Sequence, residues 1–179
     1  FAQELEEDVS QGDGQSYGDY VLVQDDYGAI QVAIPSAWTQ VDGSPWVSDG
    51  EVIGSSISAA ADLERFNNYF DEAGIFFGVS DEVAKLAGYI QLLDYYKSIF
   101  QPNCKWEYRE KYQDNAFEGS YDVYRNCDGS GNLFIVLTAR PIENKTALLV
   151  SVLFNAMTDA DLEVFDQVLA TFDVIGSLP

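Results

Sequence analysis

The stretch from Cys104 to Phe154 constrains the fold of this chain more than any other. Residues 106–112 alternate aromatic and charged side chains, a pattern typical of a β-strand with one face in water. A second strand is predicted over residues 119–126. Residues 133–139 and 147–154 are apolar on both faces, which indicates central strands that are covered on both sides. The stretch therefore predicts a four-stranded antiparallel meander.

Helices are predicted on either side of the meander. One begins at Ser80, whose hydroxyl can cap it, and runs to about Phe100. Its broad apolar stripe predicts deep packing on a sheet and comprises Val83, Leu86, Ala87, Ile90, Leu92, Leu93, Tyr96 and Ile99. A second helix is predicted from Thr158, which forms an acidic variant of a capping box with Asp161.

Earlier apolar segments complete the predicted fold. They indicate strands at 20–24, 29–34, 52–59 and 75–79, and Asp62 can cap a short helix before the last of them. Because helices are available for both faces of the sheet, we expect an α+β chain, folded as a three-layer α/β/α sandwich. Its central, mainly antiparallel sheet is expected to have about six to seven strands.

The chain is predicted to be one domain with an N-terminal tail. Its 179 residues are enough for a single buried core. Residues 1–17 are acidic and poor in apolar side chains, which predicts a flexible tail or linker, and residues 18–179 form the domain. No apolar run approaches the roughly 20 residues that span a bilayer, so no transmembrane segment is expected. The start at Phe1, without methionine, indicates a processed or trimmed chain.

The strongly acidic composition excludes one class of partner. The formal net charge is −21, from 30 acidic and 9 basic side chains. Nucleic acid binding is excluded because a polyanion would be repelled and there is no basic stripe to contact it. An anionic membrane surface is disfavoured for the same reason. The negative charge either keeps the protein soluble and monomeric, or it is an adaptation to a cationic partner, a metal ion or a salty environment.

The absence of histidine removes many kinds of active site. Ser-His-Asp and Cys-His catalysis, histidine bases and histidine-containing metal sites cannot occur in the sequence. No catalytic residue, cofactor or metal ligand is therefore assigned. Paired acids at 25–26, 71–72 and 81–82 each have a turn or helix-start explanation, but a carboxylate-based hydrolase or carbohydrate-active enzyme remains an alternative. A calcium-dependent binding module is a further alternative, although residues 126–131 only partly match a calcium loop.

The two cysteines, Cys104 and Cys127, frame the first two strands of the meander. Strands joined as a hairpin bring their outer ends together, so the spacing favours a disulfide over two buried free thiols. A disulfide in turn indicates an oxidising compartment.

Two groups of residues are candidates for contact with a partner. Trp38 and Trp46 lie in a loop rich in Gly, Pro and Asp, where they either form a binding surface or fold back to close one end of the core. Lys105, Arg109 and Lys111 gather near the cysteines, together with Lys97 and Arg125. They either present a local positive face to an acidic partner or pair with neighbouring carboxylates.

Three segments carry a family resemblance. They are Ile30-Gln31-Val32-Ala33-Ile34-Pro35 followed by Trp38, Gly74-Ile75-Phe76-Phe77-Gly78 before the predicted long helix, and the C-terminal helix from Asp161 to Val174. Together they resemble the PsbP/Mog-like α/β/α sandwich family over roughly residues 19–175, and its secreted bacterial branch in particular. The resemblance implies a binding or assembly role. Some members are attached to other domains, including trypsin-like proteases. Metal-binding histidines of the PsbP type cannot occur here, and no Ran-binding signature is present.

These observations predict a non-enzymatic, extracytoplasmic accessory or protein-binding domain, located outside the cell or in the cell envelope. It is expected to bind another protein or an upstream domain of the same chain, and could be appended to a secreted enzyme such as a trypsin-like protease.

Overall fold

The computed structural model describes residues 15–179 of the chain. The predicted tail therefore lies outside the described residues over positions 1–14. The helices and strands, in chain order, are β1 (Tyr20–Gln24), β2 (Ile30–Pro35), β3 (Gln40–Asp42), β4 (Trp46–Ser48), β5 (Glu51–Ala60), α2 (Leu63–Asn68), β6 (Gly74–Ser80), α3 (Asp81–Leu86), α4 (Tyr89–Phe100), β7 (Lys105–Gln113), β8 (Phe117–Arg125), the single 3-10 turn η2 (Cys127–Gly129), β9 (Leu133–Pro141), β10 (Leu149–Ala156), α5 (Asp159–Thr171) and β11 (Asp173–Val174).

A large antiparallel sheet forms the centre of the molecule. Its eight strands follow the order β3-β5-β6-β10-β9-β8-β7, with β4 paired to β5 beside this path. The predicted meander is confirmed as the run β7-β8-β9-β10, in which each strand pairs with the next. The α+β fold class is also confirmed, with more strands in the sheet than expected, since β3 and β4 form in the loop that carries the two tryptophans.

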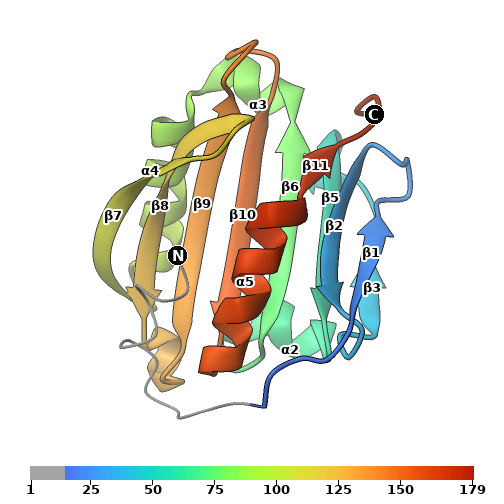
Figure 1. Ribbon diagram of the computed structural model, residues 1–179. Coiled ribbons are helices and arrows are strands. Elements are labelled where there is room, and N and C mark those ends of the chain that lie inside the picture. The colour runs from blue at the N-terminus through green and yellow to red at the C-terminus, as the bar shows by residue number, and fades with distance from the viewer. Residues whose placement is uncertain (1–14) are drawn as a thin grey trace.

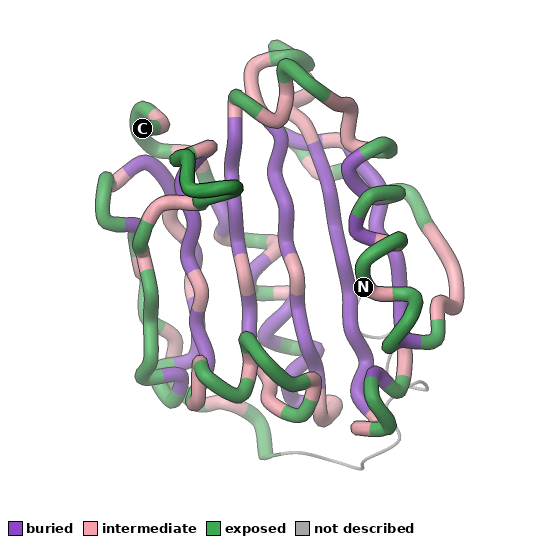
Figure 2. The backbone as a smooth tube through the Cα atoms, turned by 180° about the vertical axis from the view of Figure 1, so that it is seen from behind, coloured by how far each residue is buried: buried purple, intermediate pink, exposed green. Residues whose placement is uncertain are grey.

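Each face of the large sheet is covered differently (Figure 1). Helix α5 lies across one face, beside a small three-stranded sheet of order β1-β2-β11. Helices α3 and α4 lie on the opposite face. The main core fills the space under α5 and the small sheet, and it includes Ile30, Phe77 and Phe165, all with no exposed surface. Figure 2 shows the central strands buried along most of their length and the connecting loops exposed.

One irregularity in β7 changes which side chains share a face. The pairing of β7 with β8 shifts register between Trp106 and Tyr108, as a β-bulge does. Tyr108 and Tyr112 pack into the main core, whereas Trp106 packs into the smaller cluster under α4. Strict alternation along β7 would place Trp106, Tyr108 and Tyr112 on the same face of the sheet. This expectation is wrong for Trp106.

The predicted helix from Ser80 to Phe100 is two helices. Ala87 and Gly88 adopt extended conformations, so α3 ends at Leu86 and α4 begins at Tyr89. Glycine has a low helix propensity, and here the Gly88 N–H donates to the Gln91 side chain at 2.7 Å as a new helix begins. The prediction that the whole apolar stripe packs deeply on the sheet is therefore wrong. Helix α3 buries no residue, and Leu86 is 87% exposed.

The predicted helix starts are confirmed. Asp62 and Ser80 accept hydrogen bonds from the backbone N–H groups of Arg65 and Val83, each three residues further on. At α5, Asp161 accepts from the N–H of Thr158 at 2.8 Å and from the hydroxyl of Tyr17 at 2.8 Å. Contacts with α5 thus reach Tyr17 and Ser16, whose hydroxyl donates to Glu163 at 2.6 Å, just before the predicted start of the domain at residue 18. None of the described helices is long and apolar enough to cross a membrane.

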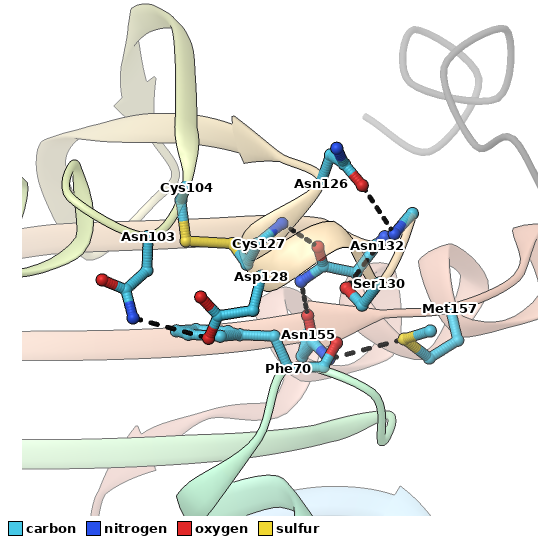
Figure 3. Close-up of a disulfide and its surroundings, with 11 residues drawn as sticks. Phe70, Asn103, Cys104, Asn126, Cys127, Asp128, Ser130, Asn132, Asn155 and Met157 are labelled. Atoms are coloured by element: carbon cyan, nitrogen blue, oxygen red, sulfur yellow. Dashed lines mark hydrogen bonds between the residues drawn. A yellow bond between two sulfur atoms is a disulfide. The ribbon is translucent and has the colours of Figure 1, made fainter.

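The predicted disulfide joins Cys104 to Cys127 at the end of the β7–β8 hairpin (Figure 3). Both cysteines are buried beneath α4. Beside them, the Asn132 side chain accepts from the Cys127 N–H at 2.8 Å and donates to Asn155, which in turn donates to the carbonyl of Glu72 at 2.8 Å. The amide pair thus links the loop before β6 to the end of the meander.

Replacing both cysteines, as Cys104→Ser with Cys127→Ser, should lower the free energy of unfolding by about 3 kcal/mol. The reason is the entropy that the unfolded chain regains when a loop of this length is opened. Urea denaturation measures the change, and reductant should destabilise the wild type by a similar amount while leaving the double variant unaffected. Equal stability of the oxidised and reduced wild type would contradict the prediction.

Candidate functional site

An open apolar depression lies beside α4, on the face of the sheet that α5 does not cover. It has a volume of about 430 Å³ and is lined by Trp46, Val47, Ser48, Ile53, Phe76, Val83, Leu92, Tyr95, Tyr96, Ile99 and Leu153. A second hollow of about 280 Å³ is lined by Phe66, Asn67, Asn68, Tyr69, Phe70, Phe76, Phe100, Phe134, Leu153 and Asn155. Phe76 and Leu153 belong to both linings, so we treat the two hollows as one feature, the α4-side groove.

The floor of the groove follows from the alternation of β6. Ile75, Phe77 and Val79 point into the main core, which leaves Phe76 and Gly78 on the α4 side. The Phe76 and Trp46 rings meet edge to face, with centroids 5.5 Å apart. A Cβ on Gly78 would lie 2.7 Å from the Phe76 ring and 2.9 Å from the Trp46 ring. Glycine at this position therefore gives both rings room on the sheet.

Helix α4 forms one wall of the groove. Leu92 and Tyr96 are buried against the sheet, whereas Tyr95 and Ile99 are 62% and 47% exposed. The Tyr96 hydroxyl donates to Ser151 Oγ at 3.1 Å, so this polar group is satisfied although it is buried. Burial raises the pKa of Tyr96 to about 12.

The far end of the groove is aromatic. The Phe70 and Phe134 rings are 5.4 Å apart and the Phe100 and Phe134 rings 4.8 Å apart, all in edge-to-face contact. Tyr69 lies at the same end and is 61% exposed. Asn155 supplies a polar group, but its amide N–H groups already donate to the carbonyls of Phe70 and Glu72. The groove thus offers mainly aromatic and aliphatic surface.

The structure separates the two tryptophan candidates. Trp38 is buried, with ring contacts to Tyr17 and Phe154, and its indole N–H donates to the Tyr17 hydroxyl at 3.3 Å. Trp38 therefore folds back to close one end of the main core, which was one of the two alternatives for it. As a buried residue it is not available to contact a partner. Trp46 is half-buried and lines the groove.

Two of the three basic candidates, Arg109 and Lys105, are paired with carboxylates. Arg109 donates to both oxygens of the buried Asp122, at 2.7 and 2.9 Å, and also to Asp94 on α4 at 2.7 Å. These two carboxylates raise the pKa of the Arg109 guanidinium above its usual range. Lys105 pairs with Glu107 at 2.6 Å. The charges of Arg109 and Lys105 are thus balanced by neighbouring carboxylates, and Lys111 is exposed on β7.

Lys97 also has a partner, since its ammonium lies 3.4 Å from the centre of the Trp106 ring. This contact is a cation–π interaction across the α4–β7 boundary. The contact helps to hold Trp106 under α4, and Lys97 keeps its positive charge there.

The adjacent acid pairs in the sequence have structural roles. Asp25 accepts from the backbone N–H groups of Ala29 and Ile30, at 2.7 and 2.9 Å, and so closes the β1–β2 turn. The pair at 71–72 contacts Arg65, and the pair at 81–82 contacts Lys85. Over residues 15–179, no three Asp, Glu, Cys or His side chains gather as a metal site would require.

Sequence reasoning missed the groove although it found most of the residues that line it. The sequence places Tyr96 and Ile99 in the apolar stripe of the helix predicted from Ser80, and Phe76 in a strand. The signal that could have found the groove is the breadth of the apolar pattern on α4, which is wider than one helix can bury against one sheet.

Comparison with known proteins shows a likeness of fold alone. Neither a protein-family model nor a curated protein sequence matches the chain. Among solved structures, a cyanobacterial PsbP (CyanoP) from Synechocystis sp. PCC 6803 is similar, with a TM-score of 0.50 and 12% sequence identity. The match covers 92% of this chain and 98% of that one. The fold is therefore PsbP-like, as the resemblance in the sequence implied.

Removing the charge of Arg109, as Arg109→Met, should lower the free energy of unfolding by about 3 kcal/mol or more, because it leaves Asp122 buried without its ion partner. The control is Lys85→Met, whose pair with Glu82 is exposed on both sides and is worth less than about 1 kcal/mol. Urea denaturation of the two variants measures both. Similar losses in the two variants would show that the Arg109 pair does not anchor α4 to the sheet.

Tyr96 should contribute to a loss of stability in alkali. Its pKa is raised above the usual value of a tyrosine in the unfolded chain, so the folded state holds the proton more tightly. The stabilisation is present below about pH 10 and is lost as the pH rises toward 12, by up to about 1.4 kcal/mol per pH unit for one group. Denaturation between pH 9 and 12 should show a smaller slope for Tyr96→Phe than for the wild type, and equal slopes would contradict the assignment.

Proposed function

We propose that this chain is a non-enzymatic, extracytoplasmic protein-binding domain and that the α4-side groove is its binding surface. The observation that carries the proposal is the size and openness of this apolar groove on an otherwise well-packed, highly charged protein. Monomeric soluble proteins rarely leave contiguous apolar surface in water unless it meets a partner. Aromatic side chains are also the residues that protein interfaces favour at their centres.

Half-exposed apolar side chains extend the groove at its rim. Val47 and Ile99 are 51% and 47% exposed, and both line the larger hollow. Tyr69 and Tyr95 expose more than half of their surface. Such side chains would be removed from water when a partner docks, at roughly 25 cal/mol for each Å² of apolar surface buried.

The disulfide supports the proposed location. Cystines persist in oxidising compartments and are rare where thiols are kept reduced. The buried Cys104–Cys127 bridge therefore favours the outside of the cell or the cell envelope. The PsbP-like fold is compatible with an accessory role, and the acidic segment 1–17 would serve to join the domain to a secreted enzyme, such as a trypsin-like protease, or to another upstream part of the chain.

Charging the rim of the groove should abolish partner binding. Ile99→Asp places a carboxylate where a partner's apolar surface would lie, whereas Leu22→Asp makes the same kind of change at a residue of similar exposure on β1, in the other layer. Both variants should fold, because both residues are about half exposed. The immobilised proteins are incubated with the extracytoplasmic fraction of the source cells.

We expect the wild type and Leu22→Asp to retain the same protein, and Ile99→Asp to retain it at least about tenfold less, equivalent to about 1.4 kcal/mol. A protein retained equally by Ile99→Asp and Leu22→Asp would place the binding surface elsewhere. Turnover of a substrate by the wild type would overturn the non-enzymatic assignment.

A further inference from the structure

We infer that the α4-side groove takes a cationic amphipathic α-helix of the partner protein. This inference rests on the proposed function and specifies the chemistry of the partner. Three observations carry it: the charge of the segments around the groove, the pairing of the strands in its floor, and the way its two hollows adjoin.

The segments that border the groove are strongly acidic. Residues 46–100, which supply most of the lining, contain nine carboxylate side chains and three basic ones. Arg65 and Lys85 pair with carboxylates of the same segment, and Asp94 pairs with Arg109, which still leaves an excess of acidic side chains. At the β4–β5 turn, Asp49 and Glu51 are exposed next to the lining residues Ser48 and Ile53. A cationic partner would be attracted to this rim and an acidic one repelled.

The floor of the groove offers side chains but few free backbone groups. Strand β6 pairs with β5 and β10, and β10 pairs with β6 and β9, so both floor strands have neighbours on both sides. An occupant that lies across them cannot extend the sheet there. Its own N–H and C=O groups would be buried against apolar side chains and must be satisfied within the occupant, which is what an α-helix does.

The two hollows adjoin in a way that suits one face of a helix. They share Phe76 and Leu153, so apolar side chains entering the two hollows would be separated by only these two floor residues. Helical residues at positions i, i+3, i+4 and i+7 project from the same face at such short intervals. The opposite, polar face of the helix would remain in water beside the acidic rim.

Exposed tyrosines provide a further place for cationic side chains. Tyr69 lies at one end of the groove and Tyr95 on the α4 wall, and both rings are more than half exposed. An ammonium or guanidinium over such a ring is stabilised by the cation–π interaction. The protein itself has this contact twice, between Lys97 and Trp106 and between Arg140 and Tyr89.

Four labelled peptides of equal length test the inference. Each has leucine on one helical face, and the remaining positions are lysine, glutamate or glutamine. The fourth is the leucine–lysine peptide with two central prolines, which prevent a helix. Fluorescence anisotropy at 50 and 300 mM NaCl measures their dissociation constants, and circular dichroism measures helix formation on binding. We expect the leucine–lysine peptide to bind at least about tenfold more tightly than each of the others at 50 mM NaCl.

Two pairs of variants locate the binding. Tyr95→Ala is compared with Tyr27→Ala, since both tyrosines are similarly exposed and Tyr27 lies at the β1–β2 turn. The double variant Asp49→Asn/Glu51→Gln removes two exposed charges beside the groove lining. Its control, Asp19→Asn/Glu143→Gln, removes two exposed charges from segments that do not line the groove. We expect the groove variants to weaken binding about fivefold and the controls less than twofold.

The outcomes separate the inference from the proposed function. If the glutamine or glutamate peptide binds as tightly as the lysine peptide and Tyr95→Ala weakens it, the groove binds peptides but has no cationic preference, and the inference falls alone. Equal binding of the proline peptide overturns the helical occupant. If no peptide binds, or if the control variants weaken binding as much as the groove variants, the cationic helix is overturned, whereas the proposed function falls only if Ile99→Asp retains the partner protein as well as Leu22→Asp does.

Discussion

The eight-stranded sheet is wider than a single helix can cover, and the rest of the structure follows from how each face meets this constraint. Neighbouring strands are about 4.8 Å apart and a helix is about 10 Å across, so one helix covers roughly two strands. On one face, α5 and the small β1-β2-β11 sheet share the cover and enclose the main core. On the other face, α4 lies over β8 and β9. Beyond α4, Phe76 of β6 and Leu153 of β10 line the open hollow. The α4-side groove is this uncovered part of the sheet.

Charge is distributed so that the few basic residues hold the structure together. Arg109 joins α4 to β8 through Asp94 and the buried Asp122, and Lys97 lies on the Trp106 ring at the same boundary. With these cations engaged internally, the outer surface is left with a large excess of carboxylates around an apolar groove. The cationic amphipathic helix that we propose as the partner rests on this combination of acidic segments and an apolar floor.

Local patterns in the sequence predicted the elements that depend on local physics. The alternation and apolar runs of residues 104–154 predicted the meander, and the hairpin they imply predicted the Cys104–Cys127 bridge. Capping side chains marked the starts of α2, α3 and α5 correctly, because an N-cap satisfies backbone N–H groups only three residues away. The break at Gly88 was missed because the apolar periodicity continues across it. The bulge near Trp106 was missed because a register shift depends on the partner strand β8.

The fold class, the order of the four meander strands, the disulfide and the exclusion of histidine chemistry could all be predicted from the amino-acid sequence. Each of these depends on composition or on contacts between segments that are neighbours along the chain. By contrast, the sequence could not predict that Trp38 is buried while Trp46 lines a groove. Nor could it predict that Arg109 forms ion pairs with Asp122 and Asp94. These outcomes depend on contacts between segments that are distant along the chain. The identity of an apolar residue in the sequence does not show whether the fold buries its side chain or leaves it exposed.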